Sequence, residues 1–352
     1  MRAGLPSTMK SVYLHAAHDL RLREEPIPAL AQPGDVLIRI EAVGVCGSDC
    51  HYYDRGRIGP YVVEEPIILG HECAGRVVEV GSAVRDLAPG DAVCVEPGVP
   101  CRECRRCKGG RYNICERGVV FMGTPPYHGA FRQYLTWPAD FVFKLPPGVS
   151  VEDGAMVEPL AVGVHACRRA GLEPGQSAAV LGAGPIGLLA LQAAAAYGAH
   201  PVIVTDVIPF RLDLARQLGA VALDAREGDL PARIRGATEG RGADVVIETA
   251  GTVPTIRQAM QMVRTGGVVV LVGLPPEDEA LLPFMDMVMR EYDLRSVFRY
   301  ANCYLPALSL IAAGRINLAA LRTHQFPLDR TEEAMKTTIK LKAEAIKVLV
   351  KP

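Results

Sequence analysis

The chain has 352 residues, which exceeds the size of an average domain and favours two domains. Hydrophobic residues make up 49% and charged residues 22%, as is typical of a compact globular protein, so intrinsic disorder is excluded. With 38 basic and 39 acidic residues the formal net charge is −1, and no global field attracts nucleic acid or an anionic membrane. We therefore expect a small-molecule partner, and neither a nucleic-acid nor a membrane partner.

The first 160 residues predict an antiparallel, partly closed β domain. Short apolar runs separated by turns recur there, among them DVLIRIEAVGVC, GRVVEVGSAV, DAVCVEPGV and FRQYLTW. The N-terminal residues lack the apolar segment and small-residue cleavage site of a secretory signal, which favours a cytoplasmic location.

From about Gln176, apolar strands alternate with helical stretches, which predicts βαβ units and a parallel sheet buried on both faces. Residues 174–205 contain no Asp, Glu, Lys or Arg and could pass for a membrane span, but their glycines and Pro185 favour a buried strand, turn and helix. The short final strand AIKVLVKP is expected to pack back onto the first domain. The predicted domains are 1–160, completed by 301–352, and 161–300.

A glycine motif follows the first strand of the parallel sheet, with the sequence Gly182-Ala183-Gly184-Pro185-Ile186-Gly187. Gly182 allows a tight turn, Gly184 lets the backbone approach a pyrophosphate, and Gly187 allows close helix–sheet packing. Asp206 ends the next strand, where a carboxylate accepts bonds from ribose hydroxyls and repels a 2′-phosphate. The motif predicts NAD rather than NADP, although Arg211, five residues on, is a residue type that can accommodate that phosphate.

Four of the ten cysteines form a C-x2-C-x2-C-x7-C cluster, at Cys101, Cys104, Cys107 and Cys115. In a cytoplasmic chain such a cluster indicates metal ligands or buried thiols rather than disulfides. Cationic residues also crowd this loop, and a zinc ribbon that binds nucleic acid is the competing interpretation. The lack of a basic surrounding domain disfavours it.

A second set of metal-ligand types is spread along the chain, at Cys46, His71, Glu72 and Glu158. Thiolate, imidazole and carboxylate together suit tetrahedral zinc, and a catalytic site keeps one position for water or substrate. Because these residues lie far apart in sequence, spacing alone does not prove a site. Taken singly, Cys46 is better explained as a buried thiol, His71 as a core or turn histidine, and both glutamates as surface carboxylates.

Several separated segments resemble one known family. Gly70-His71-Glu72-x2-Gly75-x5-Gly81, with Cys46 upstream and the glycine motif downstream, is similar to the zinc-dependent medium-chain dehydrogenases. Within that superfamily the chain most resembles the sorbitol (polyol) dehydrogenases. The segments that carry this closer resemblance are Cys46-Gly-Ser48-Asp49, His51-Tyr52, Arg57-Ile-Gly, Val157-Glu158-Pro-Leu, His165-Ala-Cys-Arg-Arg169 and Val297-Phe298-Arg299-Tyr300.

The resemblance implies a fold and a catalytic site. The fold is α/β, with a GroES-like β-rich catalytic domain and a doubly wound Rossmann domain that binds NAD. Cys46, His71 and Glu72 are expected to bind the catalytic zinc, with Glu158 either completing the shell or holding the zinc-bound water. Asp49 is expected to accept a hydrogen bond from His71, and Ser48 with His51 offers a second proton route.

The resemblance also implies a substrate wall, further cofactor contacts and a second zinc. Tyr52, Glu158, Arg299 and Tyr300 match polyol-contacting positions, where a polar wall satisfies a hydroxyl on each carbon. The other expected cofactor contacts are Val272, Gly273, Leu274, Val297, Phe298 and Arg299. The four-cysteine cluster matches a lobe that holds a closed structural zinc, which gives two zinc ions per subunit.

We expect reversible, NAD- and zinc-dependent oxidation of a secondary hydroxyl of a linear polyol, of the sorbitol or xylitol type, to the ketose. A threonine or simple alcohol dehydrogenase of the same superfamily is the enzymatic rival, disfavoured by Tyr52 and the segment VFRY. A structural relative without activity is disfavoured because all the expected metal ligands are present. The family suggests a homo-oligomer, either a tetramer or a dimer.

Overall fold

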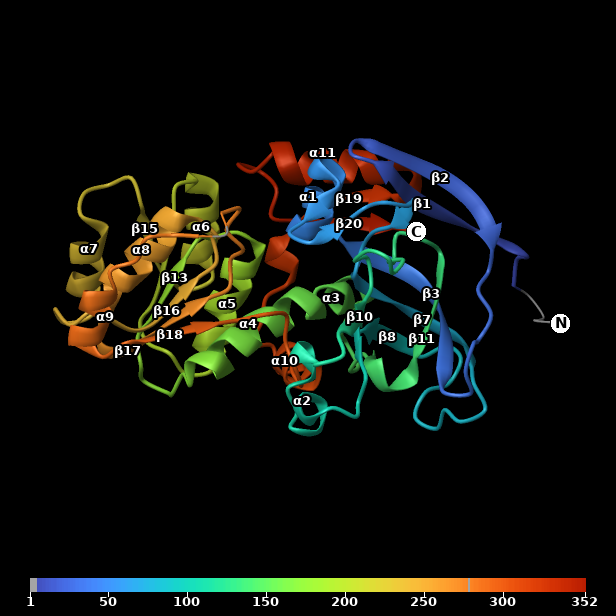
Figure 1. Cartoon of the computed structure of the whole chain (residues 1–352), viewed down its shortest axis with the longest axis horizontal. Coiled ribbons are helices and arrows are strands. Elements are labelled where there is room, and N and C mark those ends of the chain that lie inside the picture. The colour runs from blue at the N-terminus through green and yellow to red at the C-terminus, as the bar shows by residue number, and fades with distance from the viewer. Residues whose placement is uncertain (1–4, 278) are drawn as a thin grey trace. The chain divides into compact units, whose positions relative to one another are not determined.

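The structure is a computed structural model that describes residues 5–277 and 279–352. The chain forms two compact units (Figure 1). The first unit runs to Glu158 and resumes at Leu321, and the second spans Pro159–Ala320. The domain limits proposed from the sequence, near residues 160 and 300, stay a prediction.

The first unit is rich in antiparallel β-structure. Its strands are β1 (Thr8–Ala16), β2 (Asp19–Pro26), β3 (Asp35–Gly44), β4 (Arg57–Ile58), β5 (Tyr61–Val62), β6 (Ile67–Ile68), β7 (Glu72–Val80), β8 (Ala92–Val95), β9 (Gly98–Pro100), β10 (Val119–Phe121), β11 (Tyr134–Pro138), β12 (Val142–Lys144), β19 (Arg322–Pro327) and β20 (Lys347–Lys351). The main sheet has the order β12-β8-β7-β3-β20-β19, with β11 also paired to β3. A second sheet has the order β2-β1-β6.

Short helices complete this unit: α1 (Gly47–Arg55), α2 (Arg105–Lys108), α3 (Val151–Ala155), α11 (Thr331–Lys340), and the 3₁₀ turns η1 (Tyr112–Ile114), η2 (Ala139–Phe141) and η4 (Leu328–Arg330). The C-terminal strand β20 pairs antiparallel with β3, where Leu349 faces Gly44 and Val350 faces Val43. The last residues of the chain are thus part of the sheet that carries Cys46 and His71.

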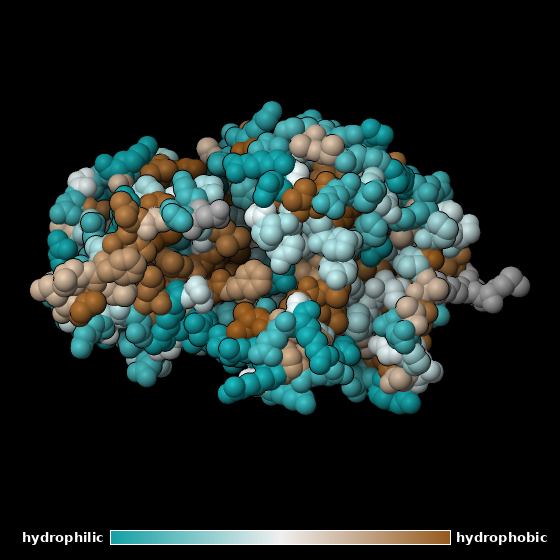
Figure 2. All heavy atoms as spheres, in the orientation of Figure 1, coloured by the Kyte–Doolittle hydropathy of each residue, from teal (hydrophilic) through white to brown (hydrophobic). Residues whose placement is uncertain are grey.

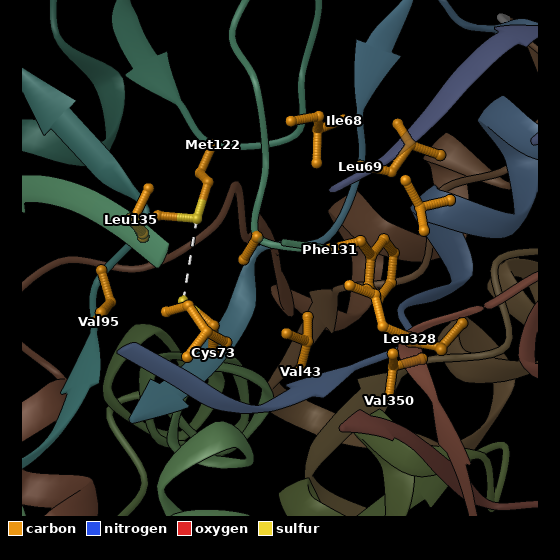
Figure 3. Packing of buried hydrophobic residues seen from close by; sticks show 14 of the residues in the cluster. Val43, Ile68, Leu69, Cys73, Val95, Met122, Phe131, Leu135, Leu328 and Val350 are labelled. Carbon is orange, nitrogen blue, oxygen red and sulfur yellow. Dashed lines mark hydrogen bonds between the residues drawn. The ribbon is translucent and has the colours of Figure 1, made fainter. Parts of the chain in front are cut away.

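The central strands of the first unit build its core, since β3 is buried along most of its length and β7 over its first four residues. Figure 3 shows how residues from distant parts of the chain interdigitate there, with Phe131 close to Leu328 and Val350. The sulfur atoms of Cys73 and Met122 lie 4.0 Å apart in the same core. Cys73 directly follows Glu72, so packing of this core fixes the start of β7.

The second unit is a parallel six-stranded sheet flanked by helices. Its strands are β13 (Ala178–Leu181), β14 (Val202–Asp206), β15 (Val221–Asp224), β16 (Ala243–Glu248), β17 (Val263–Leu271) and β18 (Asp293–Ser296). The helices are α4 (Val157–Ala170), which begins at the unit boundary, α5 (Pro185–Ala196), α6 (Pro209–Gln217), α7 (Leu230–Ala237), α8 (Val253–Met262), α9 (Phe284–Arg290) and α10 (Tyr304–Ala312), with the 3₁₀ turn η3 (Ala319–Leu321).

The strand order is β15-β14-β13-β16-β17-β18, which is the doubly wound order 3-2-1-4-5-6 of dinucleotide-binding domains. The order reverses between β13 and β16, so the glycine loop after β13 lies at the position where such sheets bind ligands. The predicted fold class, a β-rich catalytic domain with a Rossmann domain, is confirmed.

The charge-free segment 174–205 forms β13, a turn, α5 and β14, as predicted. Strand β13 is buried along its whole length, which explains its unbroken apolar sequence. Among the described residues, every helix is too short or too polar to cross a membrane.

Candidate functional site

The pairing of β3 with β7 brings Cys46 and His71 together. Gly44, the last residue of β3, faces Glu72, the first residue of β7. Cys46 therefore follows the end of one strand, and His71 precedes the start of its neighbour. A register shift of one residue would turn Glu72 to the opposite face of the sheet.

Asp49 holds the two connecting segments in place. Its side chain is fully buried in α1, where one oxygen accepts a hydrogen bond from Cys46 N at 2.9 Å and the other from Gly70 N at 3.0 Å. Asp49 Oδ1 also lies 3.6 Å from His71 Nδ1. This is the arrangement expected of a carboxylate that orients a metal-binding imidazole.

The ligand atoms of Cys46, His71 and Glu72 all lie within 4.8 Å of one another. Burial alone lowers the pKa of His71, but the Asp49 carboxylate and the Cys46 thiolate outweigh burial and hold it well above its ordinary value. The group offers one sulfur, one nitrogen and one oxygen donor, with His71 and Glu72 buried and Cys46 partly buried, and this set of donors suits zinc.

Gly44, the strand neighbour of Glu72, leaves room for its carboxylate. A Cβ atom on Gly44 would lie 1.9 Å from Glu72 Oε2, which is far inside van der Waals contact. The carboxylate thus occupies the volume that any other residue at position 44 would fill. This close approach supports a built position for Glu72 rather than an incidental one.

Lys347, which the sequence analysis did not single out, neutralises Glu72. Its ammonium donates to Glu72 Oε1 at 2.8 Å, to Oε2 at 2.6 Å and to the carbonyl of Val45 at 3.2 Å. Burial alone lowers the pKa of this ammonium, yet the negative charges of Glu72, Cys46 and Glu158 outweigh burial and raise it above its ordinary value. A lysine inside the apolar run AIKVLVKP was the available sequence signal.

Glu158 is buried at the start of α4 but does not belong to the three-residue group. The negative charge of Glu158 acts on a second buried carboxyl, that of Glu96. Glu96 accepts a hydrogen bond from the Tyr112 hydroxyl at 2.7 Å. Burial raises the pKa of Glu96 to about 7, the charge of Glu158 adds to the rise, and the Tyr112 bond opposes it. Glu96 is therefore a carboxyl that titrates near neutral pH.

Glu96→Gln tests this assignment through the pH dependence of stability. In the unfolded chain Glu96 ionises at its ordinary value of 4.5, whereas in the folded chain it holds its proton up to about pH 7. The wild type therefore loses stability relative to the variant as the pH rises from about 4.5 to about 7, by roughly 3 kcal/mol. We expect the variant's Tm to gain about 5 to 10 °C on the wild type between pH 4 and pH 8. Two Tm curves that stay parallel would contradict the raised pKa.

The four clustered cysteines converge on a point. The sulfur atoms are separated by 3.4 Å for Cys104 and Cys107, 3.8 Å for Cys101 and Cys107, and 3.9 Å for Cys104 and Cys115. Zinc–sulfur bonds of about 2.3 Å give tetrahedron edges of about 3.8 Å. A disulfide needs about 2.05 Å, and all four cysteines are free thiols. The geometry fits a tetrahedral four-thiolate metal site.

Backbone N–H groups support these sulfurs as thiolates. Cys104 N approaches the sulfur of Cys101 at 3.4 Å, and Cys107 N approaches that of Cys104 at 3.5 Å. Hydrogen bonds from the backbone at Cys107 and Glu116 lower the pKa of Cys104 to about 6. Cys104 is therefore easily deprotonated, as a zinc ligand must be, whereas burial and the hydrogen bonds to Cys104 and Cys115 raise the pKa of Cys107 to about 12.

In the second unit, the three motif glycines have different surroundings. Gly182 has φ +95°, a conformation that other residues avoid. A Cβ on Gly187 would lie 1.8 Å from the carbonyl oxygen of Gly182, whereas for one on Gly184 the nearest atom among the described residues is Arg211 Nη1, at 3.7 Å. The space in front of Gly184, at the N-terminus of α5, is thus open for the close approach of a phosphate.

The predicted cofactor residues all lie at the carboxyl edge of the parallel sheet. Asp206 ends β14 and accepts hydrogen bonds from Ala183 N at 2.6 Å, Val207 N at 2.7 Å and Ile208 N at 2.9 Å. It thereby ties its strand to the glycine loop. The remaining candidates follow β17, at Val272, Gly273 and Leu274, and β18, at Val297, Phe298 and Arg299.

Two further residues at this edge were not foreseen. Thr249 donates to the carbonyls of Leu181 at 2.9 Å and Gly182 at 3.1 Å, which braces the glycine loop. Glu248 ends β16 and accepts from Gly251 N and from the Thr255 hydroxyl, both at 2.8 Å. An acidic residue and a threonine at the end of a buried strand, in ETAG, were the available signal.

The candidate substrate residues fall in both units. Tyr52 is 2% exposed in α1, beside Ser48 and the exposed His51. In the second unit, Arg299 has φ +56° and its guanidinium lies 4.7 Å from the ring centre of Phe298. A left-handed conformation at a residue other than glycine marks a position under constraint.

Comparisons with known proteins agree with this geometry. Residues 32–147 match the alcohol dehydrogenase GroES-like domain, and residues 185–313 match the zinc-binding dehydrogenase domain. A sorbitol dehydrogenase of Bacillus subtilis is 44% identical over 100% of this chain and 99% of its own length, and one of Bos taurus is 42% identical over 100% and 98%. An Escherichia coli oxidoreductase of unknown specificity superposes with a TM-score of 0.93, at 41% identity over 98% of this chain and 99% of that chain.

A GroES-like unit with a cysteine, histidine and glutamate nest, joined in sequence to a doubly wound nucleotide-binding unit, defines a medium-chain dehydrogenase. The chain belongs to the sorbitol dehydrogenase family of the zinc-binding dehydrogenases.

Proposed function

We propose that this protein is an NAD- and zinc-dependent dehydrogenase that reversibly oxidises a secondary hydroxyl of a linear polyol to the ketose. The observation that carries the proposal is the convergence of Cys46, His71 and Glu72 within 4.8 Å, in a chain similar over its whole length to sorbitol dehydrogenases. When bound, zinc supplies a Lewis acid for the substrate oxygen and the nicotinamide accepts a hydride.

Each residue of the site has a defined task. Cys46, His71 and Glu72 hold the metal, and the Asp49 carboxylate beside His71 Nδ1 orients the imidazole. Glu158, which lies outside the three-residue group, holds the water through which the substrate proton leaves. Ser48 and His51 on α1 offer a second proton route. Tyr52, Arg299 and Tyr300 bond the remaining hydroxyls of the chain-like substrate.

The second unit binds the cofactor. Gly184 and the N-terminus of α5 receive the pyrophosphate, and Asp206 selects NAD because its charge repels a 2′-phosphate. Arg211 lies within reach of Gly184 and supplies a positive charge beside the phosphates. Discrimination against NADP therefore rests on Asp206.

A panel of substrates tests the proposal directly. The zinc-loaded protein is assayed with NAD or NADP against sorbitol, xylitol, ribitol, galactitol, threonine and 2-propanol, and kcat/KM is compared. We expect the highest value for a five- or six-carbon polyol with NAD. A preference for threonine or 2-propanol would assign the chain to a different substrate class, and a preference for NADP would contradict the role given to Asp206.

The four-cysteine cluster adds a structural zinc, so the chain holds two zinc ions per subunit. Four thiolates fill the tetrahedron and leave no position for a substrate. Cys104→Ser is expected to lower the zinc content from two to one and to reduce the Tm, because metal binding there is coupled to folding of the loop. Elemental analysis and calorimetry measure both effects, and turnover at low temperature should survive. A wild-type content of one zinc, with these thiols open to alkylation, would contradict the structural site.

The protein assembles as a homo-oligomer through the edge of the second unit. Large apolar side chains there, between 60% and 84% exposed, are Leu281, Phe284, Met285, Val288 and Met289. Figure 2 shows hydrophobic side chains gathered over the part of the molecule where Figure 1 places α9. The adjacent strand β18 ends the sheet and pairs with β17 alone among the described strands, so a second copy is a suitable occupant.

Met289→Glu tests this interface. A charge in the apolar patch is expected to shift the protein toward a smaller species in sedimentation velocity, because the carboxylate would have to be buried unpaired. The control is Val221→Glu on β15, at the opposite edge of the same sheet, which should leave the assembly unchanged. A wild type that sediments as a monomer would contradict the interface.

A further inference from the structure

Glu72 forms a buried ion pair with Lys347, a residue outside the expected ligand set. Both side chains are inaccessible, at 1% and 2% exposed. The ammonium has three protons, and three acceptors surround it: both oxygens of Glu72 and the carbonyl of Val45. The lysine is therefore fully bonded and has one defined position.

The position of this cation is set by the fold. Lys347 opens β20, which pairs with β3, and Val45 N donates to the carbonyl of Val348 at 2.9 Å. The ammonium is thus delivered by the C-terminal strand to the segment that ends in Cys46. It faces the negative charges of Glu72, Cys46 and Glu158, which are the groups expected around the metal.

We propose that Lys347 is the positioning residue of the catalytic metal site: its ammonium holds the Glu72 carboxylate at the site and weakens Glu72 as a zinc ligand. This inference rests on the proposed function, because it assigns a zinc site to Cys46, His71 and Glu72. It goes beyond that function in giving a role to a residue outside the expected ligand set.

The physical argument is a competition for one carboxylate. Each carboxylate oxygen has two lone pairs, so Glu72 can bond the ammonium and the metal together. The ammonium partly neutralises the negative charge of the carboxylate, so Glu72 donates less electron density to the metal. The two cations also repel each other. Zinc therefore keeps more of its positive charge for the substrate oxygen. Without metal, the same ammonium prevents Glu72 from being a buried, unpaired anion.

The first test measures the metal-free protein. Lys347→Met retains the length of the side chain and removes its charge, which leaves Glu72 buried and unpaired. We expect the Tm of the metal-free variant to fall by about 10 °C. The double variant Lys347→Met with Glu72→Gln removes both charges and should recover most of this loss. If the double variant is less stable than Lys347→Met, the pairing of Glu72 with Lys347 is wrong. The double variant can still be measured if Lys347→Met alone fails to fold.

The second test measures the affinity for the catalytic zinc by competition with a chelator. This ion is told apart from the zinc of the four-cysteine cluster because Cys46→Ala removes it. Because the variant destabilises the metal-free state more than the zinc-bound state, Lys347→Met should bind this ion at least about tenfold more tightly. The visible bands of the cobalt-substituted protein should shift as Glu72 becomes a stronger donor. Lys347→Arg, which keeps the positive charge, should restore the wild-type spectrum.

Lys351→Met is the matched control on the same strand. Lys351 pairs with Glu152 and is partly exposed, so its loss should change neither zinc affinity nor the cobalt spectrum. Equal or weaker zinc affinity in Lys347→Met would overturn the proposal and leave the proposed function intact. A wild type that takes up zinc only at the four-cysteine cluster would overturn the proposed function, and with it this proposal.

Discussion

Cys46→Ala is expected to lower kcat/KM for a polyol by at least about a thousandfold. Cys46 provides the sulfur of the three-residue metal nest, and its loss removes or misplaces a Lewis acid worth several kcal/mol. The variant should keep its fold, because Cys46 lies in the turn before α1 rather than in the apolar core. NAD binding, measured by calorimetric titration, should be unchanged because the glycine loop belongs to the other unit.

The chain offers a matched control four residues away. Cys50 is buried in α1, outside the metal nest, and burial raises the pKa of its thiol. Cys50→Ala deletes a similar side chain but no ligand, so it should retain wild-type turnover with at most a small loss of stability. Turnover by Cys46→Ala at the wild-type rate, with normal zinc content, would remove Cys46 from the site.

Gly187→Ala is expected to disrupt the nucleotide loop. Its new Cβ would lie 1.8 Å from the carbonyl oxygen of Gly182 and 2.9 Å from the Thr249 hydroxyl, so the backbone has to move. Overpacking of this kind costs about 1 to 3 kcal/mol or more. We expect a Tm lower by several degrees and NAD affinity reduced by at least about a hundredfold, because the displaced loop no longer presents its N–H groups.

Gly184→Ala separates ligand approach from folding. Within the described part of the chain the nearest atom to a Cβ there is Arg211 Nη1, at 3.7 Å, so the free protein should keep its wild-type Tm. The added methyl group occupies the side from which a pyrophosphate approaches, so NAD affinity should still fall. Equal Tm values for Gly187→Ala and the wild type would contradict the close contact, and unchanged NAD affinity in Gly184→Ala would place the cofactor elsewhere.

The amino-acid sequence determined most of the second unit. Gly182, Gly184 and Gly187 follow a strand and precede a helix, and the acidic Asp206 ends the next strand. Such βαβ signals are local, since they depend on residues close together in the chain. The four-cysteine cluster can also be predicted from the sequence, because all four residues lie within one loop.

The catalytic nest was only partly determined by the sequence. Resemblance to a known family points to Cys46 and His71, and the antiparallel register of β3 and β7 brings them together. The role of Gly44 follows from the same pairing, because it is the absence of a Cβ opposite Glu72 that leaves room for the carboxylate. A one-residue register shift changes all of these contacts, and short β-like runs do not specify their register.

The pairing of Lys347 with Glu72 depends on the tertiary structure. Lys347 is 275 residues from Glu72, and although a lysine inside an apolar run is unusual, the local sequence does not indicate which carboxylate it pairs with. Pairing of β20 with β3 buries it against a carboxylate. Buried charges are stable only with partners, and the partner here is supplied by a strand from the other end of the unit's sequence. Sites formed by residues close together in the chain, such as the glycine loop and the four-cysteine cluster, can therefore be predicted from the sequence. The pairing of distant charges depends on which strands pair in the folded protein.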